Sequence, residues 1–270
     1  MEETVENILS DRVSGASEIE TRTLEVLSGL PDGAPEAELS EITDRLLETF
    51  PQMANIQELA AEIQRVLAEE PARAATLLRE MAVRRLSEQR QKERRLSDVV
   101  VPLLPPGDLL VFTLSKSGTV LSVLEDLHGA GRRLAVLVAE SRPGAEGARM
   151  ARDLAERGIR SRACDDFLLL SLVPPEASAR RPPGYAGAAV VLVGADAVHP
   201  DALVNKVGTR ALLETARHVK VPAYVLASSA KLRSENAPRA LGSLFETIPR
   251  DEVVVLTERG REPQEEGGKE

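Results

Sequence analysis

The fold is decided by the stretch Ala188-Ala-Val-Val-Leu-Val-Gly-Ala-Asp196. Its first six residues are apolar and rich in valine, which predicts a strand buried on both faces. Asp196 would then lie at the carboxyl edge of a parallel sheet, where open α/β folds bind ligands. Asn205 and Lys206 are expected to open an amphipathic helix and to bring an amide, a cation and free N–H groups to the same rim. These groups together predict a site for a small anionic ligand; the alternative is an ordinary loop in which Asp196 is a helix cap.

Short apolar runs alternate with helical patterns on both sides of this stretch. The apolar runs are 109–112, 134–139 and 221–227, and the helical patterns are 120–127, 148–157 and 210–217. This alternation predicts βαβ units, hence a doubly wound, Rossmann-like α/β domain with a mostly parallel sheet over residues 99–260. Residues 174–187, rich in Pro and Gly, predict an exposed loop, and residues 261–270 predict a disordered acidic tail.

In the first part of the chain the apolar residues have a different spacing. Apolar residues recur at three and four positions over 16–30, 36–49, 56–67 and 72–96, which predicts amphipathic helices. The prolines at 102, 105 and 106 mark the boundary, so an all-helical N-terminal domain is expected over residues 1–98. The charge-dense side of 72–96 is interpreted as a solvated face, with a partner-contacting helix as the alternative.

Composition excludes several classes of protein. The chain has 270 residues and a formal net charge of −9, which argues against direct nucleic-acid binding because such binding needs Lys and Arg to neutralise phosphates. No run of about 18 apolar residues occurs, so no membrane span is expected. The acidic N-terminus does not resemble a secretory signal, and the single cysteine, Cys164, fits a packed residue in a reducing cytoplasm. No metal and no cofactor are predicted.

The segment 113–119, Thr-Leu-Ser-Lys-Ser-Gly-Thr, is a second candidate for ligand binding. It lies between a predicted strand and a predicted helix, and it offers hydroxyls, a glycine and unpaired N–H groups to an anion. It is not a Walker A loop, which needs a Lys-Ser/Thr pair after its glycines. We therefore expect Ser117, Gly118 and Thr119 to bind substrate, with helix capping by Ser117 or Thr119 as the alternative.

Several motifs, taken in order, resemble those of the initiation factor 2B alpha/beta/delta family, whose members include methylthioribose-1-phosphate isomerase and ribose-1,5-bisphosphate isomerase. The motifs are TLSKSGTV at 113–120, ESRP at 140–143, GADAV at 194–198, NKVGT at 205–209, FETIP at 245–249 and LTERG at 256–260. The resemblance is strong over about 99–260 and weak before it. It implies the two-domain fold above, a small phosphorylated ligand, and self-association into a homo-oligomer through the α/β domain.

The chain departs from the isomerases where their chemistry is carried out. The resemblance implies a cysteine at the position of Ser115, paired for proton transfer with the aspartate at Asp196. An unassisted hydroxyl cannot act as a base at neutral pH as a tuned thiol can. Two arginines that hold phosphate in the isomerases correspond to Ser14 and Phe50, and each loss removes a charged hydrogen bond of about 1.5–3 kcal/mol.

The sheet-side half of the expected pocket is retained. The resemblance implies catalytic roles for Asp196 and Ser115; in an isomerase Asp196 would be the acid/base, with Ser115 or Lys116 assisting. The expected substrate-binding residues are Ser117, Gly118, Thr119, Asn205, Lys206, Lys231 and Arg142. For Arg142, an ion pair with a glutamate that braces its loop is equally consistent with the sequence.

Three classes of function follow. The first is a non-catalytic, regulatory or scaffold protein resembling the initiation factor 2B subunits, which binds a nucleotide or sugar phosphate. The second is an aldose-ketose isomerase of a phosphorylated sugar. The third is an unrelated binding module with the same fold. The missing cysteine and arginines favour the first class over the second.

Overall fold

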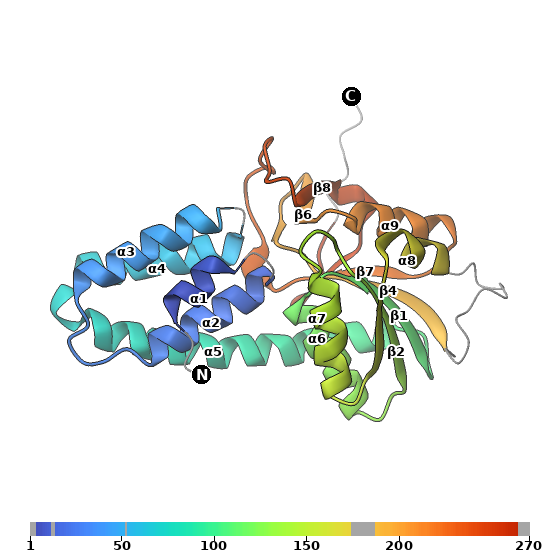
Figure 1. Ribbon diagram of the computed structural model, residues 1–270, viewed down its shortest axis with the longest axis horizontal. Helices are drawn as coiled ribbons and strands as arrows, with labels where there is room; N and C mark the ends of the chain where they lie inside the picture. Colours follow the sequence, from blue (N-terminus) through green and yellow to red (C-terminus); the bar gives the residue numbers. More distant parts are fainter. Residues whose placement is uncertain (1–3, 12–13, 52, 174–186, 264–270) are drawn as a thin grey trace. The chain divides into compact units, whose positions relative to one another are not determined.

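The computed structural model describes residues 4–11, 14–51, 53–173 and 187–263. The chain divides into two compact units, residues 1–92 and 93–270. The first unit is helical and the second carries a mostly parallel sheet, which confirms the predicted fold class (Figure 1). The division falls inside one long helix, and the domain limits of 98 and 99 proposed from the sequence stay a prediction.

Amphipathic helices build the first unit. They are α1 (Val5–Ser10), α2 (Ala16–Ser28), α3 (Glu36–Thr49), α4 (Ala54–Glu69) and the first part of α5 (Ala74–Val100), with the 3-10 turn η1 (Pro71–Arg73) between the last two. The apolar positions that recur at three and four along the sequence form the core of this unit. Leu24, Leu59, Ile63 and Leu78 are buried against one another in its interior.

A seven-stranded sheet forms the second unit. Its strands are β1 (Leu109–Leu114), β2 (Leu134–Ala139), β3 (Arg160–Cys164), β4 (Ala188–Val193), β7 (Ala223–Leu226), β9 (Val255–Thr257) and β10 (Gly260–Arg261). They lie in the order β10-β9-β7-β4-β1-β2-β3, and every pair is parallel except β9 with β10. The valine-rich stretch that decides the fold is therefore a central strand, paired with β1 on one side and with β7 on the other.

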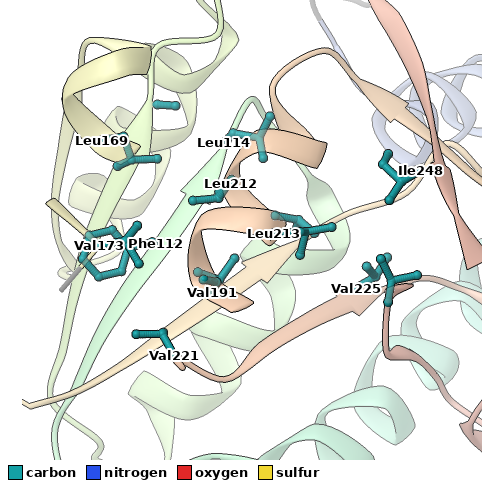
Figure 2. Close-up of a cluster of buried hydrophobic side chains, with 14 of the residues drawn as sticks. Phe112, Leu114, Leu169, Val173, Val191, Leu212, Leu213, Val221, Val225 and Ile248 are labelled. Carbon is teal, nitrogen blue, oxygen red and sulfur yellow. The ribbon is translucent and has the colours of Figure 1, made fainter. Parts of the chain in front are cut away.

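Helices cover both faces of this sheet. Alternation along β1 sends Phe112 toward α8 (Asp166–Leu172) and α9 (Thr209–His218), whereas Val111 faces α6 (Gly118–Gly129) and α7 (Glu146–Glu156). Figure 2 shows the first of these clusters, in which Phe112, Val191 and Leu212 come from β1, β4 and α9. Strands buried on both faces read as continuous apolar runs, which is why the sequence pattern identified them.

A small antiparallel sheet corrects one prediction. Asn205 and Lys206 do not open a helix: they end β6 (Ala202–Lys206), which pairs with β5 (Ala197–Val198) and β8 (Phe245–Pro249). Helix α9 begins only at Thr209, after Gly208, whose φ of 101° is left-handed and favours glycine. The short run Ala202-Leu-Val forms a strand because β8, far along the chain, supplies its hydrogen-bonding partners.

Short 3-10 turns and the C-terminal segment complete the unit. The turns are η2 (Val101–Leu103), η3 (Ser229–Lys231) and η4 (Arg250–Glu252). Buried Arg250 donates to the carbonyls of Val253, Glu262 and Pro263, and the predicted tail over 261–270 stays a prediction. The predicted loop at 174–187 lies almost wholly outside the described residues, as does the rest of the tail.

Candidate functional site

The loop between β1 and α6 holds the first group of predicted site residues. Ser115 is 6% exposed and adopts a left-handed φ of 58°, and its N–H donates to Ser141 Oγ at 2.7 Å. Ser117 is the N-cap of α6, because its Oγ accepts from the N–H of Val120 at 3.3 Å. Gly118 is the first residue of the helix and Thr119 is buried. The capping alternative therefore describes Ser117 correctly.

Gly194 brings the end of β4 against this loop. A Cβ at Gly194 would lie 2.4 Å from Ser117 Oγ and 2.9 Å from Ser117 Cβ, closer than any real contact. Only a glycine lets the two segments approach this closely. The Gly-Ala-Asp motif and the hydroxyl-rich loop are thus direct neighbours at the carboxyl edge of the sheet.

Asp196 follows at this edge and is 4% exposed, so it does not point into bulk water. Its backbone N–H donates to the carbonyl of Val204 at 2.9 Å, which fixes the turn into β5. The preceding carbonyl, Ala195 O, accepts from Lys231 Nζ at 2.5 Å. Lys231 is 4% exposed and lies in η3, so a cation is buried beside the segment that carries Asp196.

Asn205 and Lys206 reach the same edge from β6. Asn205 Nδ2 donates to Thr209 Oγ1 at 2.9 Å, and that hydroxyl donates to the carbonyl of Lys206 at 2.6 Å, which ties the strand to the start of α9. Lys206 Nζ lies 3.4 Å from Glu146 Oε1 and 4.7 Å from the centre of the Phe245 ring. Lys206 is therefore neutralised by a carboxylate and packed over an aromatic face.

Glu146 is a rim residue that the sequence analysis did not assign. It is 2% exposed, lies in the first turn of α7, and its carboxylate fills the space above Gly144. The signal was the Glu-Gly pair that follows ESRP, because a glutamate beside a glycine at a helix start is well placed to be held by the helix dipole. Nothing local in the sequence indicates its partner on β6.

Two predicted groups have partners outside this edge. The side chain of Arg142 is 69% exposed and pairs with Glu140 at 2.9 Å, which is the loop-bracing alternative. Lys116 Nζ lies 2.8 Å from Asp153 Oδ2 on α7. Both cations are therefore paired with carboxylates, Arg142 with Glu140 of its own loop and Lys116 with Asp153 of α7.

Cys164 is packed in the core of the second unit, as the sequence predicted. Burial raises the pKa of its thiol to about 11, so the thiol stays protonated at neutral pH. His199 Nδ1 lies 2.8 Å from the carbonyl of Glu235, so this ring is committed to a neighbouring loop. Among the described residues, no group of three or more His, Cys, Asp or Glu side chains is arranged to hold a metal ion.

In the first unit, Ser14 and Phe50 occupy the positions where the resemblance implies phosphate-binding arginines. Phe50 is 5% exposed and packs in an apolar cluster with Ile8 and Leu46. Ser14 donates through both its N–H and its hydroxyl to the carboxylate of Asp11, at 2.8 and 2.9 Å. The Asp11 carboxylate also pairs with the Arg22 guanidinium, so this arginine is bound to an internal carboxylate and Phe50 is used for packing.

The fold and this rim define a class of protein: a helical unit followed by an α/β unit with buried, charge-balanced polar groups at the carboxyl edge of a mostly parallel sheet. The profile of the Initiation factor 2 subunit family matches residues 12–266. The chain belongs to that family. Membership rules out the third class of function, an unrelated module with the same fold.

Relatives of both functional kinds are similar to the chain. A translation initiation factor eIF-2B subunit 2-like protein of Pyrococcus horikoshii is 27% identical over 234 residues, covering 85% of this chain and 78% of the relative. Methylthioribose-1-phosphate isomerase of Serratia proteamaculans is 30% identical, covering 84% and 66%. Ribose 1,5-bisphosphate isomerase of Archaeoglobus fulgidus is 25% identical, covering 97% and 90%.

Solved structures agree on the fold. The Pyrococcus horikoshii translation initiation factor eIF-2B has a TM-score of 0.73 at 25% identity, covering 95% of this chain and 94% of that one. The 5-methylthioribose 1-phosphate isomerase of the same organism has a TM-score of 0.71 at 21% identity, covering 96% and 83%. No helix in the described part of the chain is long and apolar enough to cross a membrane.

Proposed function

We propose that this chain is a non-catalytic, regulatory family member that binds a nucleotide or sugar phosphate at the rim and works in the cytoplasm as a homo-oligomer. The observation that carries the proposal is the state of the reactive positions. Ser115 offers a hydroxyl where the isomerases have a thiol, and Phe50 and Ser14 are used for packing and for binding Asp11. A hydroxyl needs an adjacent base to act in proton transfer.

The electrostatics of the rim predict that an anionic ligand binds weakly. Lys206 is balanced by Glu146, and Lys231 is bonded to the carbonyl of Ala195. A phosphorylated ligand must compete with these internal partners, so its binding is expected to be weak unless more of its groups are held elsewhere. The rim is thereby suited to sensing a ligand at a high concentration.

The alternative is an aldose-ketose isomerase, acting on a sugar such as ribose-1,5-bisphosphate or methylthioribose-1-phosphate. Asp196 would be the acid/base, and Ser115 would assist. The observation in its favour is that Asp196 remains buried at the strand end, within a family that contains such isomerases.

One experiment separates the two functions. Both sugar phosphates, labelled with ¹³C at C1, are incubated with the protein and followed by NMR for conversion of the aldose carbon. We expect no conversion. We expect the ¹³C signal of the sugar phosphate to shift when the protein is added, and we expect the Asp196→Asn variant to change that shift. Conversion that disappears in Asp196→Asn would establish the isomerase and refute the proposal.

The oligomer is proposed to form through the α/β unit. Phe167 is 83% exposed and Leu168 48% exposed on α8, and Val207 is 53% exposed beside α9. Phe167 and Leu168 are neighbours on one helix, and we propose that they form part of the contact surface. Light scattering at micromolar concentration should give at least a dimeric mass, which Phe167→Asp should reduce. A monomeric mass for the unmodified chain would contradict this part of the proposal.

A further inference from the structure

Arg233 differs from the two lysines at the carboxyl edge of the sheet. Lys206 is paired with Glu146, and Lys231 donates to the carbonyl of Ala195. The Nη2 atom of Arg233 is buried, yet it has no hydrogen-bond partner among the residues that the structure describes. A buried donor without a partner costs free energy, and nearly all such groups in folded proteins are paired. This guanidinium therefore carries a donor that the described chain does not use.

The segment that carries Arg233 runs beside the segment that carries Asp196. Leu232 forms a parallel bridge with Val198, and the N–H of Arg233 donates to the carbonyl of Val198 at 2.8 Å. The backbone of Arg233 is thus bonded two residues beyond Asp196. Leu232 packs against the apolar core, and side chains alternate along an extended segment, so the side chain of Arg233 leaves on the opposite side.

Two further bonds hold the loop that follows Arg233. His199 Nδ1 donates to the carbonyl of Glu235 at 2.8 Å, and the N–H of Ala237 donates to Asp201 Oδ1 at 2.8 Å. The loop is therefore fixed alongside the turn after β5, although it forms no helix or strand of its own. A cation on a fixed backbone loses less conformational entropy when a ligand binds to it.

Glu235 is the carboxylate that a ligand anion would have to compete with. It is exposed and accepts from Ser234 Oγ at 3.3 Å. The pKa of its carboxyl is lowered by hydrogen bonds from its own backbone N–H and from Ser234, and further by the positive charge of Arg233. The carboxylate therefore lies within electrostatic reach of Arg233. Attraction between exposed charges is weak, so Glu235 competes little with a ligand.

The chemistry of this unused donor fits a phosphate group. A guanidinium offers paired N–H donors that match two oxygens of a phosphate. The ligand proposed above carries such a group, while Lys206 and Lys231 already have internal partners. We infer that Arg233 binds the phosphate group of the rim ligand, an inference that rests on the proposed function.

Inorganic phosphate is the probe, titrated into the full chain labelled with ¹⁵N. The Arg233 Nε signal, identified by its absence from Arg233→Gln, should shift in a saturable manner as phosphate is added. Affinities of the variants are measured from backbone amide shifts. Arg233→Gln should weaken phosphate binding by about tenfold or more. Arg233→Lys keeps the charge without the planar fork, and its affinity should lie between those of Arg233→Gln and the parent.

Two neighbouring changes serve as controls. Arg239→Gln removes an exposed arginine of the same loop and should leave the affinity unchanged. Glu235→Gln removes an exposed negative charge and should strengthen binding by about two- to fivefold. In addition, Arg233→Gln should leave the melting temperature unchanged or raise it, because a buried donor without a partner contributes no bond to the fold.

The outcomes separate this inference from the proposed function. An unchanged affinity in Arg233→Gln, or equal losses in Arg233→Gln and Arg239→Gln, would overturn the inference and leave the proposed function standing. A lower melting temperature of Arg233→Gln would show that the guanidinium has an internal partner, and would overturn the inference as well. A parent protein without any phosphate-induced shift would contradict the proposed function together with this inference.

Discussion

Replacing Lys206 by methionine tests how the rim is held together. The Lys206 and Glu146 side chains are 10% and 3% exposed, and Nζ lies 3.4 Å from Oε1. At an effective dielectric constant of about 20, two unit charges at this distance attract by about 5 kcal/mol. Lys206→Met leaves the Glu146 carboxylate buried without its cation, so we expect the free energy of unfolding to fall by about 3–4 kcal/mol.

The assay is urea unfolding of the parent, both single variants and the double variant Lys206→Met/Glu146→Gln. The double variant should recover most of the loss, because removing both charges also removes their desolvation cost. The control is Lys116→Met, whose partner Asp153 is 26% exposed, with an expected loss of about 1 kcal/mol. A loss below about 1 kcal/mol in Lys206→Met, or single-variant losses that simply add in the double variant, would refute the reasoning.

Three further outcomes are expected. Gly194→Ala should destabilise the protein by about 1–3 kcal/mol, because the added Cβ displaces the side chain of Ser117 that caps α6. The control is Gly129→Ala, where no atom lies close to the added Cβ, and this change should stabilise the protein by up to about 1 kcal/mol. Thermal unfolding measures both variants, and a lower stability for Gly129→Ala than for Gly194→Ala would contradict the close approach of Gly194 to Ser117. Phe50→Ala should cost about 3–5 kcal/mol in urea unfolding, and a cost under 1 kcal/mol would mean that the ring is not packed as described. Burial raises the pKa of the Cys164 thiol to about 11, above that of an unfolded thiol, so its contribution to stability is present below pH 9 and is lost as the pH rises from 9 toward 11. Iodoacetamide should therefore label the native protein at pH 8 far more slowly than the urea-unfolded protein. Equal labelling rates would contradict the burial of this thiol.

The sequence predicted β1, β2, β4 and β7 because these strands are apolar runs, whereas the largely exposed β3 and the short β9 and β10 were not predicted. Runs such as 188–193 and 134–139 carry their own signal, and the structure places strands over the same residues. The antiparallel sheet was missed for the opposite reason. β5 has two residues, and β6 ends in the polar pair Asn205 and Lys206, so its pairing with β8 is fixed by contacts distant in the sequence.

The position of some candidate site residues follows from local sequence patterns, but their bonding does not. The strand-end aspartate and the capping Ser117 follow from local patterns, because a strand end and a helix start impose them. The pairing of Lys206 with Glu146, and of Lys231 with a backbone carbonyl, joins elements far apart in the chain. A pairing between residues this far apart leaves no local pattern in the sequence, so only the structure shows how the charges of the rim are balanced.

The backbone of Ser115 bears on which side chains the two positions that depart from the isomerase pattern can accept. Its left-handed conformation belongs to the main chain and is supported by the hydroxyl of Ser141, not by the Ser115 side chain. A serine-to-cysteine exchange there changes one atom without remodelling the loop. Phe50 is different, because an arginine in its place would bury a charged guanidinium in an apolar cluster. The two departures from the isomerase pattern therefore differ in kind, because the first leaves its loop unchanged and the second is built into an apolar core.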